Sequence, residues 1–160
     1  MKYTFLTVLS LIIFSLPVEA QTYQSAIGVR AGYPLSISYK KNTSEDKALE
    51  FFGGIRPYSG YNEIRLNAAL QYHNPIGDSD RFRWYYGAGA GVAIYSFENP
   101  VTNGGGASVT VSGYLGLELT FDELPLNFTL DWVPTMYFGG YGGGFGGGYG
   151  ALAIRYVLQR

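Results

Sequence analysis

The feature that most constrains the fold is a strict two-residue alternation that runs from Phe82 to Tyr95. Its even positions are all apolar or aromatic: Phe82, Trp84, Tyr86, Ala88, Ala90, Val92 and Ile94. Its odd positions are mostly small or polar: Arg83, Tyr85, Gly87, Gly89, Gly91, Ala93 and Tyr95. Successive side chains of a β-strand point to opposite faces, so the pattern predicts one apolar face and one face suited to a narrow interior. A segment of this length can cross a bilayer only if it is extended, so we predict a transmembrane β-strand.

The same alternation recurs along the chain. It predicts strands over 26–33, 35–40, 49–56, 63–73, 82–95, 109–121, 126–132 and 151–158, with Pro134 ending or bending the seventh. We expect short periplasmic turns at 42–47, 74–81 and 121–125, and outer loops at 57–61, 97–106 and 139–148. About eight strands of roughly 9–11 residues are typical of outer-membrane barrels. The predicted fold is all-β, an eight-stranded antiparallel up-and-down transmembrane β-barrel.

The N-terminal segment, residues 1–20, differs from the rest of the chain. Lys2 gives it a positive start, 5–16 is an apolar run, and 18–20 ends in small residues. This pattern is typical of a cleaved secretory signal peptide, and the run is shorter than the ~20 residues that a spanning helix needs. We expect 21–160 to form a single outer-membrane barrel domain. The chain has no cysteine, so backbone pairing rather than a disulfide framework must hold the fold.

Two arrangements of the strand faces are compatible with the alternation: an apolar exterior that faces lipid, or a lipocalin-like soluble barrel with an apolar interior. Only 14% of residues are charged, compared with about 25% in soluble domains. Large rings and leucines would overfill the interior of a small barrel, which favours the lipid-facing arrangement. The opposite face carries charges of both signs, and we expect a charge-paired lumen network: Arg30, Glu50, Glu63, Arg65, Arg83, Glu118, Asp131 and Arg155, with Lys40 and Arg56 on the same face.

Aromatic residues lie toward the ends of the predicted strands. Headgroup-level belts use such residues, and the candidate membrane-interface aromatics are Tyr33, Tyr39, Tyr72, Phe82, Trp84, Trp132 and Tyr156. General β-propensity explains the abundance of these rings but not their placement.

Several short segments resemble one known family. They are Trp84-Tyr85-Tyr86-Gly87-Ala88-Gly89, Gly116-Leu117-Glu118, Asp122-Glu123-Leu124-Pro125, Leu130-Asp131-Trp132-Val133-Pro134 and Ile154-Arg155-Tyr156. With them the chain resembles the small OmpA/OmpX-type outer-membrane β-barrel proteins of Gram-negative bacteria. The resemblance implies a fold and an outer-membrane location, with insertion by the barrel-assembly machinery, rather than a particular activity.

Sites for chemistry are sparse. His73 is the single histidine, and it is followed by Asn74 and Pro75 rather than by the serine that a lipid A deacylase would place nearby, so we interpret it as a rim or turn residue. Asp78 and Asp80 are better read as solvated turn residues than as metal ligands. We expect no catalytic residue, no cofactor and no metal.

The sequence thus favours a non-enzymatic integral outer-membrane protein with a filled lumen and surface-exposed loops, in a structural or surface-interaction role. The alternatives are a lipid-modifying enzyme, a narrow pore and, less favoured, a soluble lipocalin-like carrier. Expected partners are membrane lipid, the assembly machinery and an extracellular ligand at the loops. The net charge of −1 and the lack of a basic patch exclude nucleic acid. A monomer is expected.

Overall fold

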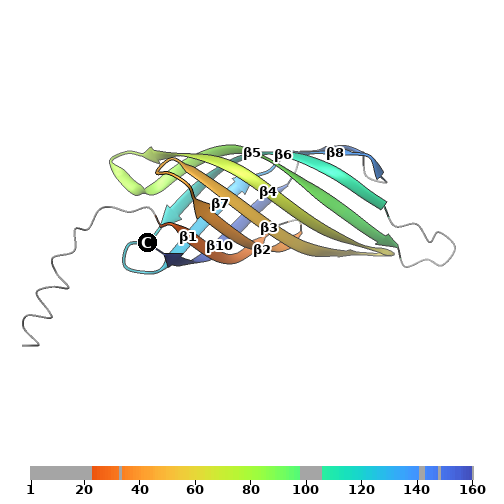
Figure 1. The fold of residues 1–160 in the computed structure, drawn as a ribbon, viewed down its shortest axis with the longest axis horizontal. Helices are drawn as coiled ribbons and strands as arrows, with labels where there is room; N and C mark the ends of the chain where they lie inside the picture. The colour runs from red at the N-terminus through yellow and green to blue at the C-terminus, as the bar shows by residue number, and fades with distance from the viewer. Residues whose placement is uncertain (1–22, 33, 98–105, 141–142, 148, 160) are drawn as a thin grey trace, which may run out of the picture.

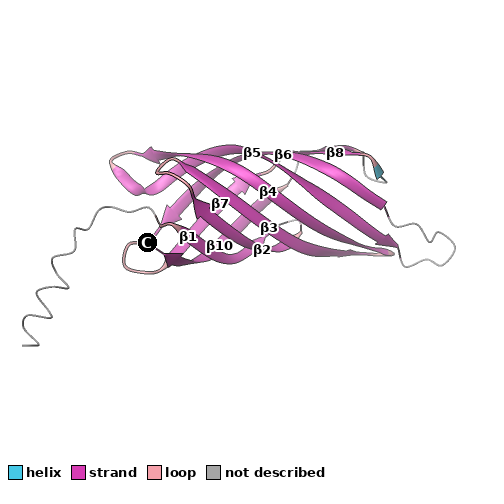
Figure 2. Ribbon diagram, viewed as in Figure 1, coloured by secondary structure: helices cyan, strands magenta, loops and turns pink. Residues whose placement is uncertain are grey.

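The computed structural model describes residues 23–159 except 33, 98–105, 141–142 and 148, and strands make up most of this part (Figures 1 and 2). The strands are β1 (Ser25–Ala31), β2 (Leu35–Asn42), β3 (Lys47–Tyr58), β4 (Tyr61–Ile76), β5 (Ser79–Phe97), β6 (Gly106–Thr120), β7 (Leu126–Trp132), β8 (Thr135–Phe138), β9 (Gly144–Gly146) and β10 (Gly150–Gln159). Within the described residues, no helix is both long enough and apolar enough to span a membrane.

The strands close into a barrel by antiparallel pairing. Each of β1 to β6 pairs with the next strand in the chain, and β7 joins β6 to β10. The pairing of β10 with β1, in which Val29 faces Ile154, closes the circle. The predicted eight-stranded antiparallel up-and-down barrel is confirmed.

The seventh strand of the barrel is interrupted by Pro134, which cannot donate a ladder hydrogen bond. β7 ends at Trp132 and β8 continues the same strand position from Thr135, and both parts pair with β6. The Gly113 N–H donates to the Pro134 carbonyl at 2.9 Å, so β6 bridges the break. Pro134 was predicted to end or bend this strand; in the structure the strand breaks there and resumes at Thr135.

The alternation in the sequence becomes an alternation between lumen and exterior. Leu66 is 54% exposed while its neighbour Arg65 is 5% exposed, and Ile154 is 46% exposed while Arg155 is fully buried. The large aliphatic and aromatic side chains thus cover the outside of the barrel, and the polar side chains fill its inside. This distribution is the reverse of the one in a water-soluble barrel.

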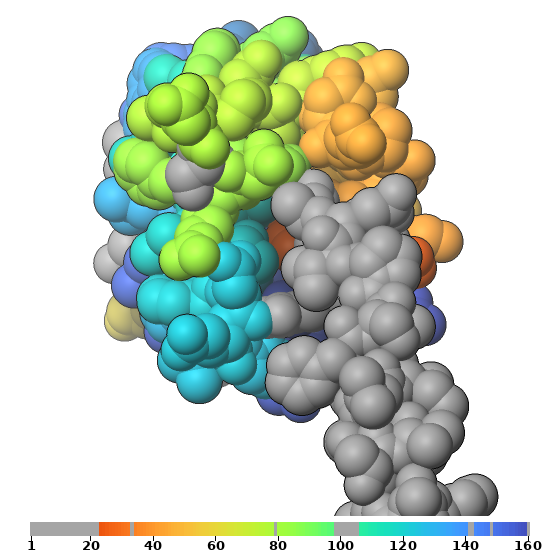
Figure 3. All heavy atoms as spheres, turned by 90° about the vertical axis from the view of Figure 1, so that its left-hand side faces the viewer, coloured from red at the N-terminus to blue at the C-terminus, as the bar shows by residue number. Residues whose placement is uncertain are grey.

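The two ends of the barrel differ. We call the end with the turns at 43–46, 77–78 and 121–125 the base; it also carries the end of β10 (Figure 1). Figure 3 looks onto the base and shows these three turns in orange, yellow-green and cyan. We call the opposite end the mouth: β3 to β6 extend there beyond β1, β2 and β10, and β8, which pairs with β6 and β9, lies beside them (Figure 1).

Three connections differ from the expectation. The predicted loop at 57–61 is a tight turn at 59–60, because β3 runs to Tyr58 and β4 begins at Tyr61, and Gly60 has the positive φ of 95° that such a turn needs. The predicted turn at 74–81 shrinks to 77–78. The predicted low-complexity loop at 139–148 contains β9, and most of the loop at 97–106 lies outside the described residues.

Candidate functional site

The interior of the barrel is filled by polar and aromatic side chains rather than by an apolar core. The largest side chains that are fully buried include Arg155, Tyr23, Tyr85, Lys40, Gln71, Glu50 and Glu118. Buried charge is costly unless it is paired and hydrogen-bonded, so the stability of the barrel depends on how completely these groups satisfy one another.

Glu50 on β3 is the centre of the main cluster. Its Oε1 accepts from the Ser38 hydroxyl at 2.7 Å and forms ion pairs with Arg155 and, at 3.5 Å, with Arg30. Its Oε2 accepts from the Gln71 side-chain amide at 2.7 Å. Both carboxylate oxygens are therefore used, and one acidic residue links four other strands across the lumen.

The two arginines of this cluster have further partners. Arg30 Nη2 donates to Asp131 Oδ1 at 2.6 Å, and its guanidinium lies 4.8 Å from the centre of the Phe52 ring. Arg155 donates to Ser38 at 2.8 Å. It also donates to Asn127 at 3.2 Å and to Thr129 at 3.1 Å on β7. The guanidinium groups thus join strands that are not all neighbours in the sheet, β1 with β7 and β10 with β3.

A second cluster lies around Glu118 on β6. Lys40 forms an ion pair with Glu118, and its Nζ lies 3.0 Å from His73 Nε2. The Tyr23 hydroxyl donates to Glu118 Oε2 at 3.3 Å. His73 is only 5% exposed, so the interpretation of it as a rim or turn residue is wrong: it faces the lumen, as its odd position on β4 requires.

Arg83 lies at the base. It donates to the Glu45 carbonyl at 2.8 Å and to the Asp80 carbonyl at 3.0 Å, so it ties two base turns together. The Ser44 hydroxyl, 2.7 Å from Asp46 Oδ1, lowers the pKa of that exposed carboxyl. Among the described residues, no group of three or more acidic or histidine side chains is placed to bind a metal.

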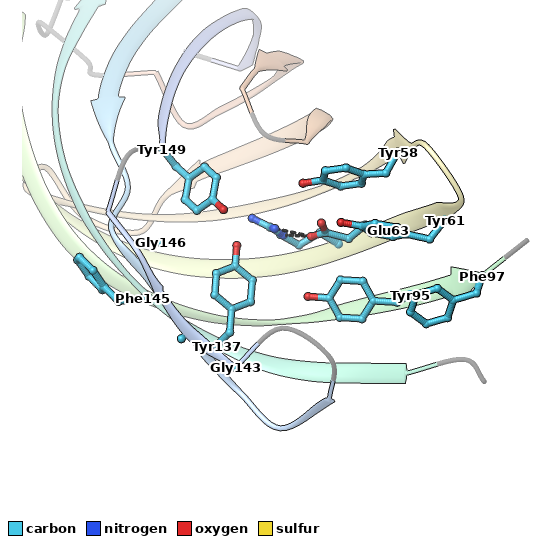
Figure 4. Close-up of a pocket in the computed structure, with 12 residues that line it drawn as sticks. Tyr58, Tyr61, Glu63, Tyr95, Phe97, Tyr137, Gly143, Phe145, Gly146 and Tyr149 are labelled. Atoms are coloured by element: carbon cyan, nitrogen blue, oxygen red, sulfur yellow. Dashed lines mark hydrogen bonds and ion pairs between the residues drawn. The ribbon is translucent and has the colours of Figure 1, made fainter. Parts of the chain in front are cut away.

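The clusters around Glu50 and Glu118 together form the polar core of the lumen. A pocket of about 430 Å³ opens at the mouth, above this polar core (Figure 4). Its rings come mainly from the extended strands and the β8–β10 region: Tyr58, Tyr61, Tyr95, Phe97, Tyr137 and Tyr149. The hydroxyls of several of these tyrosines point toward one centre, where Glu63 lies, whereas Phe145 points away from it (Figure 4). Tyr58 and Tyr61 stack with ring centres 4.3 Å apart.

The centre of this mouth pocket is an ion pair between adjacent inward positions of β4. Arg65 Nε donates to Glu63 Oε1 at 2.8 Å, and Arg65 Nη2 pairs with the same oxygen. The Arg65 guanidinium also lies 5.3 Å from the Tyr137 ring centre and 5.9 Å from that of Tyr149. Burial raises the pKa of Tyr58, at the tip of the β3–β4 turn, to about 12, so this phenol remains a donor at neutral pH.

The Tyr137 hydroxyl is buried beside Tyr149, and it makes no hydrogen bond of normal geometry with the described residues. An unsatisfied buried donor costs about 1–3 kcal/mol. Between the mouth pocket and the polar core lies a cavity of only about 30 Å³, which Arg30, Arg65 and Asn67 help to line. This cavity is water-sized. The described lumen therefore narrows from an open pocket to a packed polar core.

The structure places the predicted charged residues in three groups. Arg30, Glu50, Asp131 and Arg155 form one connected cluster, Glu63 pairs with Arg65 in the mouth, and Glu118 pairs with Lys40, which the sequence analysis placed on the same face. Arg83 does not share these carboxylates in the described contacts but holds the base turns. Sequence reasoning missed the neutral partners Tyr23, Ser38, Gln71, Tyr85, Asn127 and Thr129, although most occupy inward positions of the alternation.

The predicted interface aromatics that the structure describes lie on the exterior. Tyr39, Phe82, Trp84 and Tyr156 are exposed near the base ends of their strands, and Tyr72 is half-buried among them: Tyr72, Tyr86 and Trp84 form a continuous row of rings. Trp132 is exposed at the mouth end of β7, where its Nε1 donates to the Gly147 carbonyl at 2.6 Å. Tyr33 lies outside the described residues.

Comparisons with known proteins support the fold. The structure is similar to the N-terminal β-barrel domain of Pseudomonas aeruginosa OprF, with a TM-score of 0.61 and 16% identity over 85% of this chain and 98% of that chain. It is also similar to Neisserial surface protein A (NspA), with a TM-score of 0.55 and 9% identity over 84% of this chain and 93% of that chain. No protein-family model and no curated protein sequence matches the chain. At these identities the likeness establishes a small antiparallel barrel fold.

Proposed function

We propose that the chain is a non-enzymatic integral outer-membrane protein that presents its mouth to the outside of the cell. The observation that carries this proposal is the distribution of charge. Every exposed charged residue of the described chain lies in or beside a base turn: Lys41, Glu45, Asp46, Lys47, Asp78, Asp80, Arg81, Asp122 and Glu123. The remaining described exterior carries large apolar side chains instead.

An exterior of this kind is suited to lipid rather than to water. Soluble monomers rarely expose a contiguous apolar patch larger than a few hundred Å². Here the outward faces of adjacent strands, for example Leu117 on β6 and Leu130 on β7, which are paired in register, join into a belt around the barrel. Closure also leaves no unpaired sheet edge in the hydrocarbon.

The packed lumen supports a structural or surface-interaction role rather than diffusion through the barrel. A barrel of about eight strands has an interior that side chains can just fill. The Glu50 and Glu118 clusters occupy that space with paired groups. We expect no stable conductance steps in planar bilayers, and reproducible steps would support the narrow-pore alternative instead.

The surroundings of His73 count against the lipid-modifying alternative. Its Nε2 contacts Lys40 and lies 3.6 Å from Glu118 Oε2 inside the lumen, separated by the barrel wall from the exterior where acyl chains would lie. We expect His73→Ala to have no effect in an acyl-hydrolysis assay on lipid A. A requirement for this histidine would favour the enzyme.

The location follows from the same proposal. Residues 1–20 would direct export, the barrel-assembly machinery would insert residues 21–160, and lipid would surround a monomer. The test is the mobility of the outer-membrane fraction in SDS gels with and without boiling. A closed, hydrogen-bonded barrel should migrate as a compact species until it is heated. Unshifted protein in the soluble periplasm would overturn the proposal.

A further inference from the structure

The mouth pocket has two properties of a ligand site: an open volume and convergent polar groups. A volume of about 430 Å³ lies within the range of about 300–1,000 Å³ that small-molecule sites occupy. Among the described residues, the cavity beneath it, which Arg30, Arg65 and Asn67 help to line, is water-sized. The opening is therefore a local feature of the mouth and not a gap in the packing of the whole lumen.

The charge balance of the pocket favours a neutral ligand. Arg65 and Glu63 are paired through two contacts, so the centre of the pocket carries no net charge. The Arg65 guanidinium also lies close to the rings of Tyr137 and Tyr149. It therefore occupies the position over these rings where a ligand cation would bind. An anion would have to compete with Glu63 for the same donors.

The polar groups of the pocket match a ligand with several hydroxyls. The described hydrogen bonds from Arg65 end on Oε1 of Glu63, and a carboxylate has a second oxygen that can accept further hydrogen bonds. The phenols of Tyr58, Tyr95 and Tyr149 point toward this ion pair, and each can donate or accept (Figure 4). The buried Tyr137 hydroxyl makes no hydrogen bond of normal geometry with its neighbour Tyr149, and a ligand hydroxyl at that depth can bond to it. An acyl chain could not form hydrogen bonds with any of these groups.

The aromatic side chains of the pocket also fit a saccharide. Tyr58 and Tyr61 are stacked, and Tyr61 lies 6.2 Å from Tyr95 and 5.7 Å from Phe97 between ring centres, so β3, β4 and β5 present one aromatic wall. Sugar rings have apolar C–H faces and hydroxyl edges. Such a ring can lie against the wall while its edge reaches the Arg65–Glu63 pair.

We propose that the mouth pocket binds a neutral saccharide. The inference rests on the proposed function, which places the mouth outside the cell. The ligand can be a free saccharide or the headgroup of a glycolipid, because the pocket would recognise the same hydroxyls and ring faces in both.

The test is titration of the full-length folded protein with lactose, maltose and chitobiose, monitored by ligand-observed NMR. The detergent should be a polyoxyethylene type that carries no sugar. Choline and sialic acid serve as the charged comparators. A second arm uses vesicles with and without a lipid that carries a neutral disaccharide headgroup, and it distinguishes a membrane-borne source from a free one.

Two adjacent residues of β8 give matched variants. Tyr137 lines the pocket, whereas Phe138 is 52% exposed on the opposite face. We expect Tyr137→Ala to weaken binding of a neutral disaccharide by roughly threefold to tenfold, and Phe138→Ala to leave it unchanged. Tyr61→Ala should weaken binding similarly.

Three results would overturn the saccharide proposal: no binding of any neutral disaccharide at millimolar concentration in either arm, binding of choline or sialic acid that depends on Tyr137, or equal losses in the two β8 variants. Each variant is first tested for the heat-dependent mobility shift in SDS. A normal shift together with any of these results would reject the saccharide and leave the outer-membrane barrel intact. Loss of the shift in the wild type would reject the barrel itself.

Discussion

The polar core and the mouth pocket are built from the same residue types but differ in packing. Both contain an arginine–glutamate pair surrounded by tyrosines, Arg155–Glu50 in the core and Arg65–Glu63 in the mouth. Around Glu50 the barrel is closed on all sides, and the nearby cavity measures only about 30 Å³. Around Glu63 the described wall consists of the extended strands, the β8–β9 hairpin and Tyr149, and it encloses a pocket of about 430 Å³. Strand length, rather than composition, decides where this barrel is filled.

The largest effect is expected in the core. Glu50→Gln removes the charge that balances two buried guanidinium groups, and breaking a buried pair on one side costs about 3–5 kcal/mol. Glu63→Gln makes the same chemical change beside the mouth pocket, where its described partner is one guanidinium rather than two, and it should cost about 1.5–3 kcal/mol. Urea unfolding from lipid vesicles measures both. Equal losses would show that the core and the mouth do not differ in packing.

The next effect contrasts the apolar belt with the base. Leu130 is 58% exposed on the outer face of β7, and Leu130→Arg should cost about 2–4 kcal/mol if this position lies near the bilayer midplane. Leu124 is 51% exposed in a base turn, where the same substitution should cost about 0–1 kcal/mol. The fraction that assembles into the outer membrane and the unfolding free energy report the difference. Normal assembly of Leu130→Arg would mean that the face assignment is wrong.

A smaller effect measures how tightly the core is packed. A Cβ added at Gly116 would lie 2.6 Å from the Asp131 Cβ and 2.8 Å from the Tyr85 ring, so Gly116→Ala should cost about 1–3 kcal/mol. At Gly113 on the same strand, the nearest contact would be the Pro134 ring at 3.5 Å, and Gly113→Ala should be nearly neutral. Comparison of the two urea midpoints tests this. A neutral Gly116→Ala would show that the core has room to spare.

The smallest effect concerns the link between the wall and the mouth. Trp132→Phe keeps a ring on the exterior but removes the donor to the Gly147 carbonyl, which should cost about 0.5–1.5 kcal/mol. Because this bond holds the segment near β9, we expect faster proteolysis there without a change in the heat-dependent gel shift. An unchanged rate of cleavage would mean that this contact does not hold the mouth.

The sequence predicted the fold well because alternation is a local property. An odd or even position along a strand decides whether a side chain points into the barrel or outward. Arg155 and Leu130 were therefore assigned to the correct faces without any knowledge of their partners. The number of strands followed from the same pattern. The tight turn at 59–60 was missed because Pro57 and Gly60 suggested a loop, whereas backbone pairing continues to Tyr58 and Tyr61.

The site was less predictable because it depends on contacts across the barrel. Parity places Glu50 inside, but the shear between distant strands decides that Arg30 and Arg155 both reach it. The mouth pocket depends on strand ends that extend beyond their neighbours, and neither Tyr137 nor Tyr95 carries a local signal for it. His73 was misassigned because Pro75 suggested that the strand ended there, whereas β4 continues through Pro75.

The most direct test of the central claim uses the two tryptophans of the chain, Trp84 and Trp132, which are 39% and 51% exposed on the outer face. The measurement is their fluorescence in vesicles with ordinary and with brominated acyl chains, together with quenching by aqueous iodide. If the apolar exterior faces lipid, brominated chains should quench the emission strongly and iodide should have little effect. Emission that iodide quenches and brominated lipid does not would place this face in water and contradict the membrane barrel.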